Sequence, residues 1–333
     1  MLPIFQIKDQ LQQAVSSTGL AVISAPTGSG KSTQVPQMLL EMLPSDGKII
    51  VLQPRRLAAR MLAERVASEM KVPLGSLVGF QTRYERILSP ESRIIFITEG
   101  ILTRMLISDP ELKGISAIVF DEFHERSMNV DIGLAMAWHC RQTRRPDLKL
   151  LVMSATLDID LLLNYLPGSV SIHAEGKMYP VEITYLKHPI PPNVFQNAAN
   201  ALKRLLNSGL AGDVLIFMPG GYEIRKTEEE CRRIHSSEPL LFLPLYGDLP
   251  PEQQRAVMEP SDRRKIIIAT NIAETSLTIP GVRHVIDSGL MRISNFDPIR
   301  GVDMLETQKI PRSSADQRCG RAGREAPGTC QRL

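Results

Sequence analysis

Short apolar runs alternate along this chain with segments in which apolar residues recur every three or four positions. In the first half, the apolar runs occupy residues 20–24, 48–53, 93–98, 117–121 and 149–154, and helical spacing is found at residues 2–15, 34–42, 54–70 and 100–107. The alternation begins again beyond residue 181, with apolar runs at 213–218, 240–245, 265–269 and 282–287 and helical segments at 197–207 and 251–258. Strands that alternate with helices indicate βαβ units and parallel sheets covered on both faces. We therefore predict an α/β protein of two tandem domains, residues 1–175 and 176–333.

Composition supports this prediction and narrows the class of protein. A chain of 333 residues, 43% hydrophobic and 23% charged, is typical of a globular protein with two domains. No apolar stretch approaches the roughly 20 residues of a transmembrane helix, and the N-terminus lacks the features of a signal peptide. The four cysteines, at positions 140, 231, 319 and 330, have no paired spacing, which indicates reduced thiols in a cytoplasmic protein. The net charge of +3 is weak support for a nucleic-acid partner.

Residues 25–33 read Ala-Pro-Thr-Gly-Ser-Gly-Lys-Ser-Thr and lie between the first apolar run and a helical segment. A glycine-rich turn at that place lets backbone N–H groups surround a phosphate, and the helix N-terminus adds positive potential. Lys31 would reach the β- and γ-phosphates, and the Ser32 hydroxyl would bind Mg²⁺. The alternative is a Gly/Ser turn that happens to precede a lysine. The candidates for nucleotide binding are Thr27, Gly28, Ser29, Gly30, Lys31, Ser32 and Thr33.

Two adjacent carboxylates, Asp121 and Glu122, end a later apolar run. Ligands of an open parallel sheet bind at the carboxyl ends of its strands, where the glycine-rich turn also lies. Asp121 would hold Mg²⁺ directly or through water, and Glu122 would orient and polarise the attacking water. The alternative is a charged turn that closes a strand. The second half of the chain has no glycine-rich phosphate loop, so we expect one nucleotide to be held from both sides by two similar domains.

The segment Asp121-Glu122-Phe123-His124 resembles the Asp-Glu-Ala-His signature of the DEAH-box helicases of superfamily 2. The other motifs of that family follow in order over nearly the whole chain: Ia at residues 53–60, Ib at 98–104, III at 154–156, IV at 215–220, V at 269–278 and VI at 317–324. In having phenylalanine at position 123, the segment is most similar to the bacterial HrpB-type branch of the family. The resemblance implies two RecA-like domains, each a mostly parallel sheet flanked by helices, with ATP and Mg²⁺ between them. It also implies ATP hydrolysis coupled to 3′→5′ translocation on RNA and unwinding of RNA.

Motif VI supplies positive charge for a transferring phosphoryl group. Guanidinium groups match phosphate oxygens, and Arg321 and Arg324 lie three residues apart, so on one helical face both could point at the phosphates. The alternative is a basic helix face in water. The resemblance implies that these two residues are arginine fingers and that Gln317 helps to place the attacking water. It implies coupling roles for His124, Ser154, Thr156 and Ser276, with His124 joining Gln317 across the cleft.

The resemblance also implies how the base and the nucleic acid are bound. In the family, adenine lies between an arginine, matched here by Arg65, and an aromatic residue, whose position is held here by Met258. A thioether packs on a purine less specifically than a ring, and no motif reads the adenine edge, so other nucleoside triphosphates should be accepted. The expected nucleic-acid contacts are Arg55, Arg56, Thr98, Thr103 and Thr278, each of which could equally be a surface or capping residue. Few aromatic residues are available for stacking, so single-strand binding should ignore base sequence.

Three further expectations concern the end of the chain and its partners. Residues 290–296 and 302–308 flank a turn composition and predict a β-hairpin, either a surface hairpin or the wedge that the family places at a duplex junction. The chain stops nine residues after Arg324, so we expect the truncated core of a longer helicase, a monomer that prefers single-stranded RNA to DNA and unwinds duplex poorly alone. Two rival interpretations are a P-loop ATPase of another class and a nucleic-acid-binding module that no longer hydrolyses nucleotide.

Overall fold

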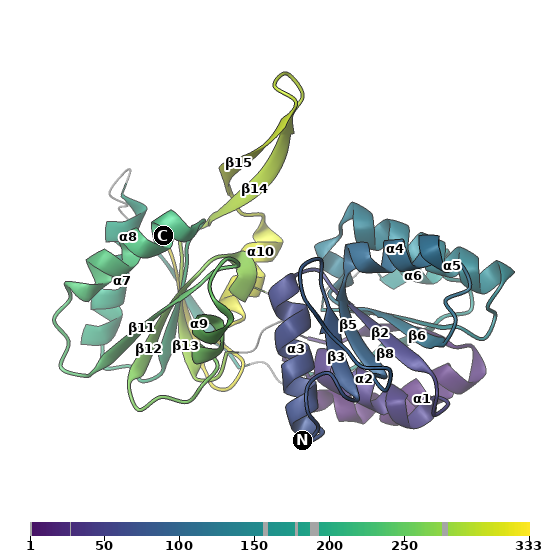
Figure 1. Cartoon of the computed structure of the whole chain (residues 1–333). Helices are drawn as coiled ribbons and strands as arrows, with labels where there is room; N and C mark the ends of the chain where they lie inside the picture. The colour runs from purple at the N-terminus through teal and green to yellow at the C-terminus, as the bar shows by residue number, and fades with distance from the viewer. Residues whose placement is uncertain (1, 27, 156–158, 177–178, 187–192, 275–278) are drawn as a thin grey trace. The chain divides into compact units, whose positions relative to one another are not determined.

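The computed structural model describes residues 2–26, 28–155, 159–176, 179–186, 193–274 and 279–333 (Figure 1). The chain divides into two compact units, Met1–Lys177 and Met178–Leu333. In each unit a parallel sheet is flanked by helices, which confirms the predicted α/β fold class. No helix within the described ranges is long and apolar enough to cross a membrane.

The first unit contains an eight-stranded sheet in the order β4-β3-β5-β2-β6-β7-β1-β8. Every pairing is parallel except that of β3 with β4. A parallel strand is covered on both faces, so its sequence is a continuous apolar run, as in β2 with Lys-Ile-Ile-Val-Leu-Gln. The strands are β1 Leu20–Ser24, β2 Lys48–Gln53, β3 Val78–Gln81, β4 Arg86–Ile87, β5 Ile94–Thr98, β6 Ile115–Phe120, β7 Lys149–Ser154 and β8 Val170–His173.

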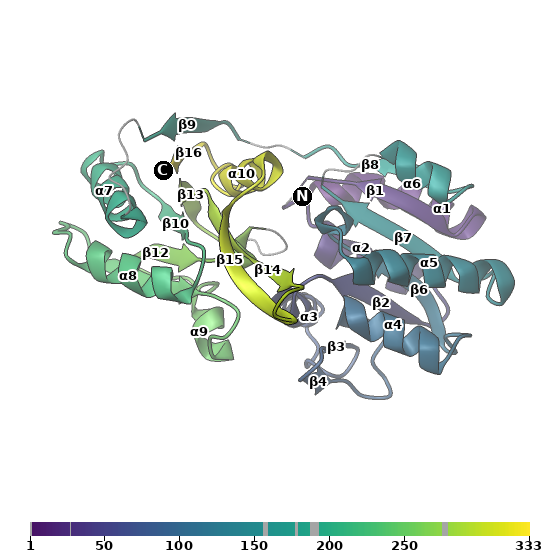
Figure 2. The same cartoon turned by 90° about the horizontal axis from the view of Figure 1, so that it is seen from above.

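Two hydrophobic cores lie on the two faces of this sheet. Side chains of β2 alternate between them, since Ile49 and Val51 belong to one core and Ile50 and Leu52 to the other. The first core is covered by η1 Pro3–Ile7, α1 Lys8–Ser17, α2 Lys31–Met42 and α3 Arg56–Glu69. The second is covered by α4 Glu99–Ser108, α5 Met128–Thr143 and α6 Ile159–Tyr165 (Figure 2). The short turn η2, Phe123–Glu125, links β6 to α5.

The second unit contains a six-stranded parallel sheet in the order β11-β12-β10-β13-β16-β9. Its strands are β9 Val181–Tyr185, β10 Asp213–Phe217, β11 Leu240–Leu245, β12 Arg264–Ala269, β13 Val282–Asp287 and β16 Gly328–Arg332. Its helices are α7 Val194–Asn207, α8 Gly221–Arg232, α9 Pro251–Ala256, η3 Asn271–Ala273 and α10 Arg312–Cys319. Helices α7 and α8 cover the core formed by β10 and β12.

A two-stranded antiparallel hairpin extends from the sheet of the second unit (Figure 1). It consists of β14 Leu290–Asp297 and β15 Val302–Lys309, paired without a register shift. The Asp297 side chain accepts hydrogen bonds from the N–H groups of Ile299 and Arg300, which fixes the connecting turn. Four apolar side chains near the tip, Phe296, Ile299, Val302 and Leu305, are exposed.

Candidate active site

The connection from β1 to α2 in the first unit has the backbone of a phosphate loop. Gly28 and Gly30 have φ angles of 85° and 92°, in the left-handed region that glycine adopts without strain. Helix α2 begins at Lys31, so the N–H groups of Lys31 and Ser32 have no acceptor one turn earlier in the helix and are available to an anion, whereas the Thr33 N–H donates to the carbonyl of Gly30. Ser29 is buried, and its hydroxyl has no hydrogen-bond partner among the described residues. Thr27 lies outside the described residues.

Two carboxylates and one lysine are buried together beside this loop. Lys31 Nζ lies 3.2 Å from Glu122 Oε1, and the two side chains are only 3% and 2% exposed. Asp121 is also buried and accepts hydrogen bonds from the Ser32 hydroxyl and, at 2.9 Å, from the N–H of Glu122. The structure thus brings together four residues that the sequence predicted from two separate motifs. The cluster carries one more negative charge than positive when both carboxylates are ionised.

Burial and the neighbouring charge of Glu122 raise the pKa of Asp121 to about 6, although Lys31 and the hydrogen bonds from Ser32 and Gln53 oppose the shift. A divalent cation would relieve this excess of negative charge. The Ser32 hydroxyl and the Asp121 carboxylate are the oxygen donors that Mg²⁺ prefers, and Mg²⁺ commonly keeps water and phosphate as its other ligands. The residues present therefore fit a magnesium–nucleotide complex.

Gln53 is a site residue that the sequence analysis missed as an individual. It is the last residue of β2, is fully buried, and donates from Nε2 to Asp121 Oδ2 over 2.7 Å. The available signal was a polar residue at the end of an otherwise apolar run, inside motif Ia. Because β2 is the neighbour of β6 in the sheet, Gln53 orients the carboxylate that follows β6.

His124 and Ser154 are also brought together in the first unit. His124 Nδ1 lies 3.1 Å from Ser154 Oγ and 3.5 Å from Glu122 Oε2. Ser154 is the last residue of β7, so this contact joins motif III to the carboxylate motif. The two other residues predicted to couple the motifs, Thr156 and Ser276, lie outside the described residues.

In the second unit, motif VI adopts a different local structure from the one predicted. Helix α10 ends at Cys319, so Arg321 and Arg324 lie in the turns that follow it, and the prediction that they share a helical face is wrong. The turn packs tightly on neighbouring backbone: a Cβ on Gly323 would lie 2.5 Å from the carbonyl oxygen of Tyr179. Gln317 lies in the last turn of α10 and is half-buried.

Buried arginines hold the motif VI turn against motif V. Arg318 is fully buried; it donates to Glu274 at 2.9 Å and to Asp287 at 2.8 Å, and its guanidinium lies 4.8 Å from the ring centroid of Phe217. Arg321 Nε donates to the main-chain oxygen of Glu274 over 2.8 Å. Arg318, which the sequence analysis quoted only as part of the motif, is therefore the anchor of this turn.

The two residues predicted to hold the base are both on the surface of their units. The Arg65 side chain on α3 is 69% exposed and pairs with Glu69 at 2.7 Å. Met258 is half-buried just beyond α9, where its N–H donates to the carbonyl of Arg255. The contact of either residue with a base remains a proposal.

Comparison with known proteins identifies the family. Residues 6–162 match the sequence family of the DEAD/DEAH box helicases, and residues 197–326 match the helicase conserved C-terminal domain. The crystal structure of the Escherichia coli DEAH/RHA helicase HrpB matches with a TM-score of 0.93 and 42% identity, over 100% of this chain and 42% of that one. The chain belongs to the DEAD/DEAH box helicases. This confirms the resemblance that the motifs indicated.

Two curated relatives of this DEAD/DEAH box helicase chain match it from end to end. The ATP-dependent RNA helicase HrpB of Escherichia coli is 43% identical over 329 residues, which are 98% of this chain and 40% of that protein. The ATP-dependent RNA helicase HrpA of Borreliella burgdorferi is 38% identical over 341 residues, covering 100% of this chain and 41% of that protein. The chain therefore spans less than half the length of these relatives.

Two of the predicted nucleic-acid contacts of this helicase chain lie at the carboxyl ends of the neighbouring strands β2 and β5. Arg55 comes after β2 and pairs with Glu125 at 3.1 Å, while Thr98 ends β5. Arg56 is exposed, with its guanidinium 5.3 Å from the ring centroid of Tyr84. The Thr103 hydroxyl is buried and has no hydrogen-bond partner in the described ranges, so in this structure it does not face solvent. Thr278 lies outside the described residues.

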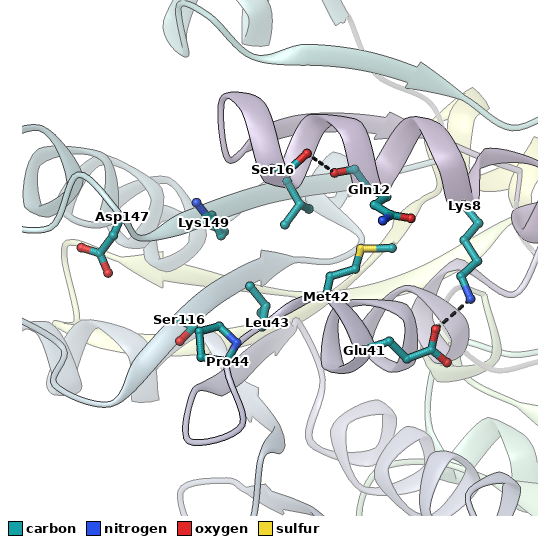
Figure 3. Close-up of a pocket in the computed structure, with 11 residues that line it drawn as sticks. Lys8, Gln12, Ser16, Glu41, Met42, Leu43, Pro44, Ser116, Asp147 and Lys149 are labelled. Atoms are coloured by element: carbon teal, nitrogen blue, oxygen red, sulfur yellow. Dashed lines mark hydrogen bonds and ion pairs between the residues drawn. The ribbon is translucent and has the colours of Figure 1, made fainter.

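A cavity of about 680 Å³ lies where strands of the first sheet begin, at the edge opposite the phosphate loop (Figure 3). Its lining includes Lys149, the first residue of β7, and Ser116, near the start of β6. The phosphate loop follows the carboxyl end of β1, and parallel strands place all their carboxyl ends at one edge. The cavity is therefore separate from the candidate nucleotide site. Its other lining residues are Lys8, Gln12, Val15, Ser16, Glu41, Met42, Leu43, Pro44 and Asp147.

Proposed function

We propose that this chain is the catalytic core of an ATP-dependent RNA helicase: a nucleic-acid-stimulated ATPase that requires Mg²⁺ and moves 3′→5′ along single-stranded RNA. The single observation that carries the proposal is the buried cluster of Lys31, Ser32, Asp121 and Glu122 beside a phosphate loop, in a chain of the DEAD/DEAH box family. The names of the relatives HrpB and HrpA, both ATP-dependent RNA helicases, favour RNA over DNA.

Within the first unit, each residue of the cluster has a distinct role. Lys31 exchanges its partner, leaving the Glu122 carboxylate for the β- and γ-phosphates of a bound triphosphate. Glu122, released from that ion pair, orients and polarises the attacking water. Ser32 and Asp121 would hold Mg²⁺, which when bound neutralises charge on the phosphate oxygens. Gln53 keeps Asp121 oriented during the exchange.

In the second unit we assign Arg321 and Arg324 as the arginine fingers of the same reaction, with Gln317 placing the water. Arginine fingers contribute about 10³–10⁵ in rate in related phosphoryl transfers. Arg318 fixes the turn that carries them through its buried pairs with Glu274 and Asp287. The base would lie between Arg65 and Met258, with little discrimination among nucleoside triphosphates.

The domain roles follow from these assignments. Residues 1–175 would be the ATP-binding domain and residues 176–333 the domain that supplies motifs IV to VI, each binding the nucleic-acid backbone. The β14–β15 hairpin would act as a wedge at a duplex junction. We expect the chain to be a monomer that turns over nucleotide and unwinds duplex poorly.

Measuring ATP turnover with and without oligo-RNA and oligo-DNA tests the proposal. The wild-type chain should hydrolyse ATP faster with RNA than with DNA or with no nucleic acid, and Lys31→Ala and Glu122→Gln should abolish turnover. Turnover without nucleic-acid stimulation would favour a P-loop ATPase of another class. Nucleic-acid binding without any turnover would favour a binding module. Equal turnover by wild type and both variants would refute the catalytic assignment.

A further inference from the structure

The ion pair between Arg55 and Glu125 joins the nucleic-acid motif to the catalytic turn of the first unit. Arg55 Nη2 lies 3.1 Å from Glu125 Oε2, and the side chains are 23% and 19% exposed. Arg55 precedes the first residue of α3, and Glu125 is the last residue of η2, directly after the Asp-Glu-Phe-His segment. The two residues are 70 positions apart in sequence, so only the tertiary structure brings them together.

The turn that carries Glu125 also carries the catalytic carboxylate. The N–H of Glu125 donates to the main-chain oxygen of Glu122 over 2.9 Å. Two non-glycine residues on either side of this turn, Glu122 and Arg126, have positive φ angles of 50° and 38°. Such conformations cost free energy and persist only where surrounding contacts hold them. The Arg55–Glu125 pair is one of those contacts.

A second link runs parallel to the first. Gln53 and Arg55, two residues apart at the end of β2, bind Asp121 and Glu125 respectively. The end of β2 is thus connected to both ends of the segment 121–125. A ligand that moves Arg55 would act on the same short stretch of backbone that positions the metal-binding and water-orienting carboxylates.

We propose that Glu125 is an internal competitor of the nucleic-acid backbone for Arg55. Without nucleic acid, Glu125 holds the Arg55 guanidinium; a phosphate of single-stranded RNA takes its place, and the released Glu125 loosens the turn that carries Glu122. Glu125 is therefore a positioning residue that tunes RNA affinity and couples RNA binding to the nucleotide site. This inference rests on the proposed function, because it requires RNA to bind at Arg55.

The size of the effect follows from the exposure of the pair. A partly exposed ion pair at this distance is worth a free energy that corresponds to about 1.5- to 5-fold in an equilibrium constant. RNA must pay this cost to displace Glu125, so removing the carboxylate should tighten RNA binding by that factor. An increase in affinity is informative, since damage to the fold would lower affinity.

The chain offers a matched control in the same neighbourhood. Asp131 on α5 also carries one negative charge, and it pairs through both oxygens with Arg126, the residue after Glu125. The negative charges of Glu125 and Asp131 both raise the pKa of Glu99, so the two carboxylates lie near the same residue. Asp131→Asn therefore removes the same charge from the same region without releasing Arg55.

The experiment measures binding of a fluorescein-labelled oligouridine by anisotropy, without nucleotide and at low salt, for the complete chain. Glu125→Gln and Glu125→Ala should each tighten binding about 1.5- to 5-fold, and Asp131→Asn should change it less. Arg55→Ala should weaken binding, and adding Glu125→Gln to Arg55→Ala should produce no further change. Thermal melting confirms that each variant is folded.

Each outcome has one meaning. Tightening that depends on Arg55 and exceeds that of Asp131→Asn supports the competitor role, and tightening that persists in Arg55→Ala overturns it. Unchanged or weaker binding by both Glu125 variants, or equal tightening by Asp131→Asn, overturns it while leaving the proposed function standing. A wild-type chain that binds no oligouridine at all overturns both the proposed function and this inference.

Discussion

Replacing Lys31 should destabilise the first unit far more than replacing Glu122, although the two residues form one ion pair. The buried cluster contains one cation, Lys31, and two carboxylates, Asp121 and Glu122. Lys31→Met leaves two buried negative charges without a cation. Glu122→Gln leaves one cation with one carboxylate, which is a balanced pair. The ion pair alone would predict equal losses, whereas the cluster predicts unequal ones.

Magnitudes can be worked from the burial of these groups. Removing one partner of a buried ion pair costs about 3–5 kcal/mol, so we expect that loss for Lys31→Met. Raising the pKa of Asp121 from 3.8 to about 6 means that its ionisation costs about 3 kcal/mol of folding free energy at neutral pH. Part of that cost comes from the charge of Glu122, so Glu122→Gln should be neutral or slightly stabilising. The double variant should lie between Lys31→Met and wild type.

Urea unfolding followed by tryptophan fluorescence measures these differences. Trp138 is the only tryptophan of the chain and lies on α5, against the second core of the first unit. Its emission therefore reports on the unit that contains the cluster. With a urea dependence of about 3 kcal/mol per molar, Lys31→Met should lower the midpoint by about 1–2 M.

The pH dependence provides a second check of the same reasoning. In Lys31→Met the pKa of Asp121 should lie above the wild-type value of about 6, because Lys31 opposes the rise, and the excess negative charge of this variant falls as the carboxyl binds a proton. The difference between this variant and wild type should therefore shrink as the pH is lowered from 7 to 5. If Glu122→Gln destabilises the first unit as much as Lys31→Met, the charge-balance account of the cluster is wrong.

Three other predictions concern the same sites. If the ionised Asp121 holds Mg²⁺ as proposed, the Mg²⁺ concentration for half-maximal ATP turnover should rise as the pH falls below 6, by up to about tenfold per pH unit; a flat profile between pH 5 and 7 would contradict this. Gln53→Leu removes a hydrogen bond that lowers the pKa of Asp121, so the pH at which the Mg²⁺ requirement rises should shift upward. Gln53→Glu, which adds a carboxylate in place of the donor, should not bring this pH back to the wild-type value. Arg318→Met removes the buried cation that pairs with Glu274 and Asp287, so the free energy of unfolding of the second unit should fall by about 3–5 kcal/mol. Hydrogen exchange at β13 measures this loss, and exchange unchanged from wild type would rule out the anchoring role of Arg318.

Local sequence determined the elements that are built from continuous apolar runs. The observed bounds of β1, β2, β7, β11 and β13 coincide with runs that can be read directly from the chain. In β1, β2 and β7 the reason is burial on both faces, which requires apolar residues at nearly every position. The sequence analysis did not predict helix α5. Met128 and Ile132 are exposed while Val130 and Leu134 are buried, so apolar residues occur on all sides of this helix and the sequence shows no helical periodicity. The edge strand β9 is as long as β1 but is largely exposed and alternates apolar with polar residues, so it shows no continuous apolar run.

The candidate chemistry was also present in the sequence, because a phosphate loop and an acidic strand end are local motifs. The sequence alone did not indicate, however, that these two motifs lie side by side. The order β2-β6-β7-β1 places the ends of these strands along one edge, and that order is set by long-range packing.

Only the tertiary structure could therefore show that Gln53 holds Asp121 across 68 positions, or that Glu125 holds Arg55 across 70. The same reason explains the error in motif VI. Spacing alone allowed a helix through Arg321 and Arg324, but α10 ends at Cys319, and Gly323 in the turn beyond it packs against the backbone of Tyr179. Periodicity records which side of an element is buried, while the identity of what lies against it depends on residues far away in the chain.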